Sequence, residues 1–274
     1  MIPRTRDGIP LLGLGTFGRT GPEGLAAILN GLEAGYRHID TAQSYGTEGN
    51  VGEAVRRSGL PRSEVFLTTK IADTNLDSPR ALESVERSLE TMGLDHVDLL
   101  LIHWPSQRDA VPFEDYMGAL AEAQERGWAR LVGVSNFTIR HLDRTEALLG
   151  PGRLATNQVE IHPYLQSRRL VAHARSRGLP LTAYQPLAKG RVAQDPVLAA
   201  IGETHGVTAA AVALAFLMAE GHVVIPASSH PGRLRENMAA LDLRLSAEET
   251  ERVRALDRGQ RFINPEKSPD WDDR

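Results

Sequence analysis

The sequence contains no cysteine, and this absence excludes several kinds of chemistry. Without a thiol there is no disulfide framework, no thiolate nucleophile and no metal site built on sulfur. The nine histidines do not replace it, because the chain has neither His-x-His nor His-Glu-x-x-His and no tight group of histidines and carboxylates. We therefore predict that the protein has no metal site.

Long apolar runs and blocks of one charge are also lacking. No segment approaches the ~20 apolar residues that span a bilayer, and the N-terminus has no apolar stretch typical of a signal peptide. Lys and Arg number 31 against 35 Asp and Glu, so the net charge is −4, and the basic residues are scattered. This balance argues against nucleic acid or a membrane as a partner. We expect a cytoplasmic protein that acts on a small molecule.

One unit recurs along the 274 residues: a short apolar run, a polar turn and an amphipathic helix. Such alternation indicates right-handed βαβ units and a parallel sheet. The expected strands are Leu11–Leu14, Tyr36–Ile39, Val65–Thr69, Val97–Ile102, Arg130–Val134, Ala155–Glu160, Leu181–Tyr184 and Val223–Ile225. Helical patterns between them include Pro22–Ala34, Asn50–Arg57, Ala81–Met92, Tyr116–Arg126 and Val197–His205.

Eight such units in one run favour a closed (β/α)8 TIM barrel, which typically needs ~250 residues, over an open doubly wound sheet. Asp7-Gly8 suits the turn of a short N-terminal hairpin. Ser246 and Glu249 have the spacing of a capping box, which predicts an extra helix after the eighth unit. No linker is visible, so we expect a single domain over residues 1–274.

The predicted strands are apolar inside and polar where they end. In a barrel the chemistry lies at the C-terminal ends of the strands. Any one polar residue there could be structural, but many on one rim predict a polar site at the barrel mouth. They are Asp40, Lys70, His103, Ser135, Asn136, Asn157, Gln158, Glu160, Ser228 and Ser229.

Asp40, Tyr45, Lys70 and His103 also form a chemically sensible set. A carbonyl group that accepts hydride develops negative charge on oxygen and needs a proton donor. A free tyrosine has a pKa of ~10, and a neighbouring ammonium such as Lys70 favours its ionised form and so lowers that pKa. Asp40 would hold Lys70 in place, and His103 would orient the carbonyl oxygen.

With these residues the chain resembles the aldo-keto reductases. The matching segments cover most of its length. They are Leu14-Gly-Thr-Phe17, His38-Ile-Asp-Thr-Ala-Gln-Ser-Tyr45-Gly, Thr68-Thr-Lys70, Leu99-Leu-Leu-Ile-His-Trp-Pro105, Val132-Gly-Val-Ser-Asn-Phe137, Thr156-Asn-Gln-Val-Glu160, Tyr184-Gln-Pro-Leu187 and Ile225-Pro. Within the family the chain is most similar to bacterial 2,5-diketo-D-gluconate reductases of the B type. Leu101-Ile-His-Trp-Pro-Ser106, Pro163-Tyr-Leu-Gln166 and the tail Asn264-Pro-Glu…Pro269-Asp-Trp271 support this comparison.

The resemblance implies NADPH-dependent reduction of carbonyl groups. It makes Tyr45 the general acid, tuned by Lys70 and Asp40, with His103 positioning the carbonyl. Ser135, Asn136 and Gln158 would bind the nicotinamide amide, and Tyr184 would stack on the ring. Pro186 and Leu187 would lie near the pyrophosphate, and the adenosine end would face Ser228, Arg233, Glu236 and Asn237. The family's usual state implies a monomer.

One position departs from the family pattern. Relatives commonly have Lys directly after the Ile-Pro of the eighth strand, whereas this chain has Ala227. The 2′-phosphate of NADPH therefore loses a cation. Arg233, with Arg235 as a second candidate, and the N-terminus of a helix that starts near Pro231 remain to bind it. We expect NADPH to be preferred, with NADH use possible.

The sequence indicates a class of substrate rather than one compound. Phe17, Trp104 and Trp271 are expected to line the substrate pocket, although Phe17 and Trp104 could instead cap the barrel core. The short connection 105–112 favours an open pocket for small polar carbonyls, such as keto-sugar acids or methylglyoxal. A substrate carboxylate could meet Arg19, Arg108, Arg191 or Arg261.

Two other interpretations compete with these. Gly13-Leu-Gly-Thr-Phe-Gly18 matches a dinucleotide-binding loop, but no helix opens on its last glycine, as a Rossmann loop requires. A cofactor-bound regulatory subunit of the same fold is the alternative function, and an intact set of four catalytic residues favours the enzyme.

Overall fold

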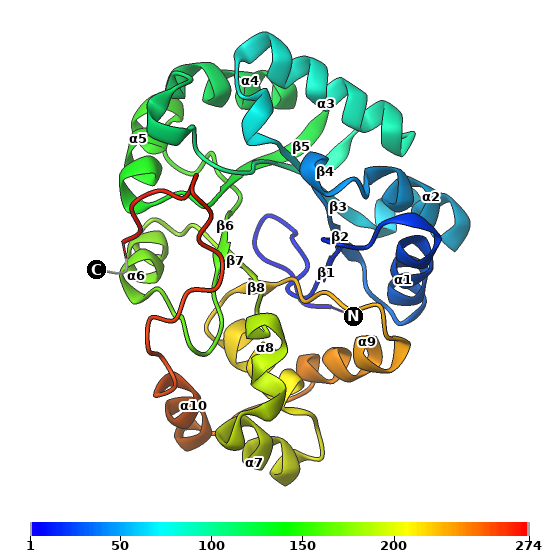
Figure 1. The fold of residues 1–274 in the computed structure, drawn as a ribbon, viewed down its shortest axis with the longest axis vertical. Coiled ribbons are helices and arrows are strands. Elements are labelled where there is room, and N and C mark those ends of the chain that lie inside the picture. The colour runs from blue at the N-terminus through cyan, green and yellow to red at the C-terminus, as the bar shows by residue number, and fades with distance from the viewer. Residues whose placement is uncertain (1, 273–274) are drawn as a thin grey trace.

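The computed structural model describes residues 2–272 and contains a ring of eight parallel strands (Figure 1). The strands pair in chain order, each with the next. They are β1 (Leu14–Gly15), β2 (His38–Asp40), β3 (Phe66–Ile71), β4 (Val97–Ile102), β5 (Ala129–Ser135), β6 (Asn157–Glu160), β7 (Leu181–Tyr184) and β8 (Val223–Val224).

Backbone hydrogen bonds also join the two ends of this sheet. Leu12 bridges Val224 in parallel, and Gly13 N donates to the Val224 carbonyl at 2.9 Å. Gly15 N donates to the Pro226 carbonyl at 3.0 Å. The sheet therefore curls until its first and last strands meet, which is the (β/α)8 arrangement that the alternating pattern predicts.

Helices surround the ring, as Figure 1 shows. They are α1 (Gly21–Glu33), α2 (Glu48–Ser58), α3 (Ser78–Met92), α4 (Phe113–Glu125), α5 (Ile139–Leu149), α6 (Arg168–Ser176), α7 (Pro196–His205), α8 (Ala209–Ala219), α9 (Pro231–Met238) and α10 (Ala247–Arg254). The side chains of Ser246 and Glu249 each accept a hydrogen bond from the other's backbone N–H at the start of α10. Among residues 2–272 no single helix is long and apolar enough to cross a membrane; α7 and α8 are so only when taken together, and they are bent by 91°.

The strand register places the inward side chains in layers. On β3 the residues Phe66, Thr68 and Lys70 share one face, because successive side chains of a strand alternate. Phe66 belongs to a small apolar cluster with Leu99, Leu101, Val223 and Ile225. Thr68 hydrogen-bonds His38 Nε2 at 3.0 Å in the next layer. Lys70 lies above them, at the end where the strands run out, which we call the barrel mouth.

Two glycines of β1 and its approach are required by packing. A Cβ on Gly13 would lie 2.7 Å from Nδ1 of His38, and one on Gly15 would lie 3.1 Å from the Ile225 carbonyl oxygen. The Gly-x-Gly pattern thus serves close packing against His38 of β2 and against Ile225 after β8 rather than a dinucleotide. Helix α1 begins only at Gly21, three residues after Gly18.

Candidate active site

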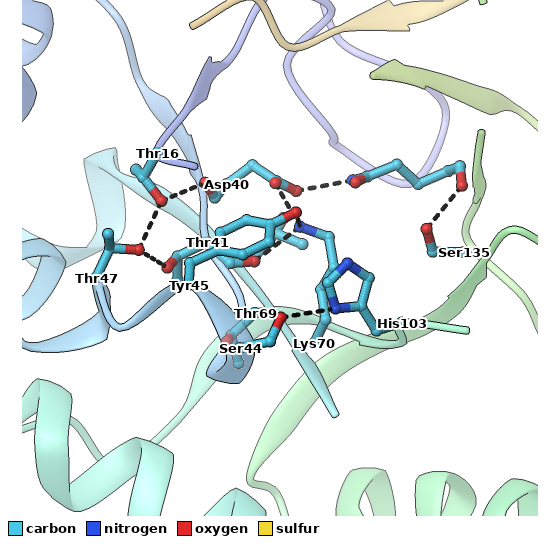
Figure 2. A network of polar contacts seen from close by, with 12 residues as sticks. Thr16, Asp40, Thr41, Ser44, Tyr45, Thr47, Thr69, Lys70, His103 and Ser135 are labelled. Atoms are coloured by element: carbon cyan, nitrogen blue, oxygen red, sulfur yellow. Dashed lines mark hydrogen bonds and ion pairs between the residues drawn. The ribbon is translucent and has the colours of Figure 1, made fainter. Parts of the chain in front are cut away.

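The four predicted catalytic residues come from three neighbouring strands. Asp40 is the last residue of β2, Lys70 lies near the end of β3, and His103 directly follows β4. Tyr45 lies on a short 3-10 turn, Gln43–Tyr45, after β2. Figure 2 shows the side chains of Tyr45, Lys70 and His103 directed toward one another. The parallel sheet brings the four together because all its strands end at the same rim.

Lys70 and Asp40 form a fully buried ion pair. Lys70 Nζ lies 2.5 Å from Asp40 Oδ1, and the two side chains are 0% and 2% exposed. The ammonium also donates to the Thr41 carbonyl at 2.8 Å. Burial alone would lower the pKa of Lys70, but Asp40 and Tyr45 favour its charged form, and its pKa is raised overall. The ammonium is therefore charged at neutral pH.

The phenol of Tyr45 lies next to the Lys70–Asp40 ion pair, on the side of Lys70. Its oxygen is 3.5 Å from Lys70 Nζ, and the ammonium is 4.9 Å from the ring centroid. Burial raises the pKa of Tyr45, Lys70 lowers it, and Asp40 raises it, so the net direction is upward. Lys70 thus acts in the predicted sense. The expectation of a lowered pKa is not met, because desolvation outweighs the ammonium.

His103 completes the group as a neutral imidazole. Its ring lies 5.4 Å from that of Tyr45, edge to face. Burial, then Lys70, then Lys267 hold the pKa of His103 well below its usual value. Nδ1 lies 3.3 Å from the Ser44 hydroxyl, and this contact fixes how the ring is turned.

The predicted pocket residues surround the same group. Phe17 is 65% exposed, and its ring lies 5.1 Å from that of Tyr45. The ring centroids of Trp104 and His103 are 6.4 Å apart, and those of Trp271 and Trp104 are 6.2 Å apart. The structure therefore places Phe17, Trp104 and Trp271 around the catalytic candidates.

The residues expected to bind nicotinamide adjoin the ion pair. Gln158 Nε2 donates to Asp40 Oδ2 at 2.7 Å, and the Ser135 hydroxyl donates to the Gln158 carbonyl at 2.8 Å. Asn136 has a left-handed backbone, with φ of 62°, and its Oδ1 accepts from the Tyr184 hydroxyl at 2.8 Å. These side chains form one polar cluster next to Asp40.

The expected pyrophosphate and adenosine residues lie on the neighbouring loops. Pro186 and Leu187 follow β7 in a loop where Gln185, Ala188 and Lys189 all have positive φ. Ser228, Arg233, Glu236 and Asn237 follow β8, the last three on α9. Arg233 and Glu236 are exposed, whereas Asn237 is 3% exposed.

The N-terminus of α9 differs from the sequence-based expectation. His230 Nδ1 accepts hydrogen bonds from Gly232 N at 3.1 Å and from Arg233 N at 3.4 Å. A side chain of this chain therefore occupies the donors that we expected to attract a phosphate. Arg233 and Arg235 remain as exposed cations on this helix.

Comparison with known proteins shows the family to which the chain belongs. The family model described as "Aldo/keto reductase family" matches residues 11–258. A methylglyoxal reductase DkgB from Salmonella typhi is 44% identical over 265 residues, which are 96% of this chain and 99% of the relative. One from Yersinia pestis is 40% identical with the same coverage.

The chain belongs to the aldo/keto reductase family. It is an oxidoreductase, and carbonyl reduction with a nicotinamide cofactor is the family's chemistry.

Solved structures agree with this membership. The crystal structure of a protein assigned as a 2,5-diketo-D-gluconic acid reductase B matches with a TM-score of 0.95 and 42% identity, over 99% of this chain and 98% of that chain. An aldo-keto reductase solved in complex with NADPH matches with a TM-score of 0.90 and 28% identity, over 99% and 94%. The similarity to B-type enzymes that the sequence indicates is thus confirmed.

Several contacts of this aldo/keto reductase were not predicted. The hydrogen bond between Ser44 and His103 could have been suspected, since Ser44 directly precedes Tyr45 in the family segment that begins at His38. Glu160 was noted only as a polar strand end. It is fully buried, and its two oxygens accept from Phe262 N at 2.7 Å and Ile263 N at 2.8 Å. It anchors the C-terminal tail, residues 258–272.

Proposed function

We propose that the protein uses NADPH to reduce small polar carbonyl compounds to alcohols, with Tyr45 as the general acid. Keto-sugar acids such as 2,5-diketo-D-gluconate and dicarbonyls such as methylglyoxal are the proposed substrates. The observation that carries this proposal is the group of Asp40, Lys70, Tyr45 and His103 at one barrel mouth. We further propose that the chain acts as a single domain, as a monomer and in the cytoplasm.

The proton comes from Tyr45 in this proposal. A substrate oxygen that accepts from the Tyr45 hydroxyl would also be within reach of His103, whose Nδ1 faces Ser44 and whose Nε2 is left for the substrate. Lys70 stabilises the phenolate that remains, and Asp40 keeps Lys70 charged and fixed. When bound, the reduced nicotinamide supplies the hydride.

The polar cluster fits a nicotinamide amide. A primary carboxamide both donates and accepts hydrogen bonds, and Ser135, Asn136 and Gln158 offer hydroxyl and amide groups of both kinds. Tyr184 is partly exposed beside them, which suits a ring that stacks. Gln158 also contacts Asp40 at 2.7 Å, so the proposed cofactor site and proton donor share one network.

Lys70→Met is expected to slow turnover and to move the alkaline limb of the pH profile upward. The acid form of Tyr45 is required, so activity falls as pH rises through its pKa. Lys70 lowers that pKa, and removing the ammonium raises it. The measurement is kcat against pH, with a primary isotope effect from deuterated NADPH to show that chemistry limits the rate. An unchanged limb would mean that Lys70 only positions its neighbours.

The cofactor prediction concerns Arg233. One charge-assisted hydrogen bond contributes ~1.5–3 kcal/mol, or about 10- to 150-fold in affinity. We expect a moderate preference for NADPH in the parent. Arg233→Ala should weaken NADPH far more than NADH, and Ala227→Lys should tighten NADPH selectively. Arg235→Ala tests the second candidate, and Arg252→Ala, at an exposed position of α10, is the control for the loss of one positive charge. Equal losses of both cofactors in Arg233→Ala, measured by tryptophan quenching at fixed ionic strength, would contradict this assignment.

The test of the function is turnover. Purified protein with NADPH and either methylglyoxal or 2,5-diketo-D-gluconate should consume cofactor and form the alcohol. A regulatory subunit of the same fold would bind NADPH and turn over little of either substrate. Binding without turnover across both substrates would therefore favour that alternative.

A further inference from the structure

The C-terminal tail lies along the rim of the barrel mouth. Glu160 at the end of β6 accepts hydrogen bonds from the backbone N–H groups of the tail residues Phe262 and Ile263. Its last described residues reach the start of α5, where Ile139 N donates to Asp272 Oδ2 at 2.9 Å. Between these anchors the tail passes the loops that follow β3 and β4.

Lys267 is the tail residue that meets those two loops. Its Nζ lies 2.6 Å from Oδ1 of Asp73, which follows β3. The same ammonium lies 5.6 Å from the ring centroid of Trp104, which follows β4 and neighbours His103. The two side chains of the ion pair are 33% and 27% exposed, so both can meet a solute at the mouth.

Two of the four arginines singled out from the sequence lie over aromatic rings of the tail itself. Arg191 lies over the ring of Phe262 at 4.9 Å, and Arg261 over that of Trp271 at 3.8 Å, beside the buried Glu160. Lys267, by contrast, is close enough to His103 that its charge helps to lower the pKa of that imidazole. Its field therefore reaches the atoms that would hold the reacting carbonyl.

We propose that Lys267 is a specificity-determining residue whose ammonium attracts carbonyl substrates that carry a carboxylate, and that Asp73 moderates this attraction. The idea rests on the proposed function, because it concerns substrates of the same site. A neutral dicarbonyl such as methylglyoxal has no carboxylate to contact the ammonium. A keto-sugar acid gains a charge contact, and the Asp73 carboxylate, which shares the ammonium, weakens that contact.

This assignment makes opposite predictions for the two partners of one ion pair. Lys267→Met should lower kcat/KM for 2,5-diketo-D-gluconate roughly fivefold, the size of a partly exposed ion pair. Asp73→Asn should raise it by a similar factor, since a negative charge leaves and the ammonium is freed. Methylglyoxal kcat/KM should stay within about twofold in both variants, and Lys267→Arg should resemble the parent. Salt should reduce both effects.

A purely structural role for the ion pair gives a different pattern. If it only fastens the tail, Lys267→Met and Asp73→Asn would change both substrates in the same direction, and that result would overturn the proposal. Arg252→Met, on the exposed side of α10, is the control for loss of one positive charge. It should change neither substrate.

A binding experiment distinguishes this proposal from the proposed function. D-gluconate carries the carboxylate but no reducible carbonyl, and Trp104 and Trp271 adjoin the site, so its binding should quench tryptophan fluorescence. Binding should weaken in Lys267→Met and tighten in Asp73→Asn even if turnover fails. Equal affinity in the parent and both variants, or no binding in any, would overturn the role of Lys267 whatever the enzyme reduces.

Discussion

Tyr45→Phe is expected to lower kcat for carbonyl reduction by about 10²- to 10⁴-fold, the usual contribution of general acid catalysis. The variant loses only a hydroxyl, which lies 3.5 Å from Lys70 Nζ. The ring contacts with Phe17 and His103 are kept, so the fold and NADPH affinity should change little. Single-turnover rates and cofactor titrations measure the two effects separately.

A second tyrosine provides the control. Tyr164 donates its hydroxyl to Asp195 Oδ2 at 2.9 Å, away from the four candidates. Tyr164→Phe removes a hydroxyl of the same kind and should keep kcat near that of the parent. A loss below tenfold in Tyr45→Phe would refute the role given to Tyr45 and would shift attention to His103.

The eight-strand order was predictable because each strand carries a β-branched or apolar run between a helix and a polar turn. The residues at which the strands begin and end were harder to predict. Tyr36 was expected in a strand, but β2 begins at His38, and the Tyr36 hydroxyl instead donates to the Leu234 carbonyl at 3.3 Å. An aromatic residue that packs a loop onto a helix looks in sequence like the start of a strand.

Some residues of the site could be predicted from the sequence and others could not. Asp40, Lys70 and His103 were predictable as polar strand ends, because a parallel barrel gathers such ends at one rim. Lys267 was not, since it lies 164 residues after His103 in a tail without periodicity. The cap that His230 forms at the N-terminus of α9 could not be predicted either, because whether a histidine accepts hydrogen bonds from the following backbone N–H groups depends on its rotamer. Contacts between loops depend on their shape, which the sequence pattern does not encode.

Asp40→Asn is expected to cost about 3–5 kcal/mol of unfolding free energy, the range for removing one partner of a buried ion pair. Lys70 would stay fully buried with its charge unmatched. Asp40→Asn/Lys70→Met should cost less than Asp40→Asn alone, because no unpaired charge remains. Glu114→Gln breaks the exposed pair with Arg144 and should leave the free energy of unfolding almost unchanged, because solvent screens that pair. Urea denaturation at constant ionic strength compares the four proteins.

The pH dependence of these free energies isolates the charge of Lys70. In the parent the folded pKa of Lys70 is raised, so its contribution is present below the unfolded value of ~10.4 and lost as pH rises through the folded pKa. In Asp40→Asn, burial without a carboxylate should depress the folded pKa. The unfolded state then binds more protons, and stability should rise with pH up to ~10.4. The difference between parent and variant should therefore shrink between about pH 7 and about pH 9.5. A difference that stays constant over this range would mean that Asp40 stabilises the barrel through hydrogen bonds to Gln158 and Lys70, not through the charge.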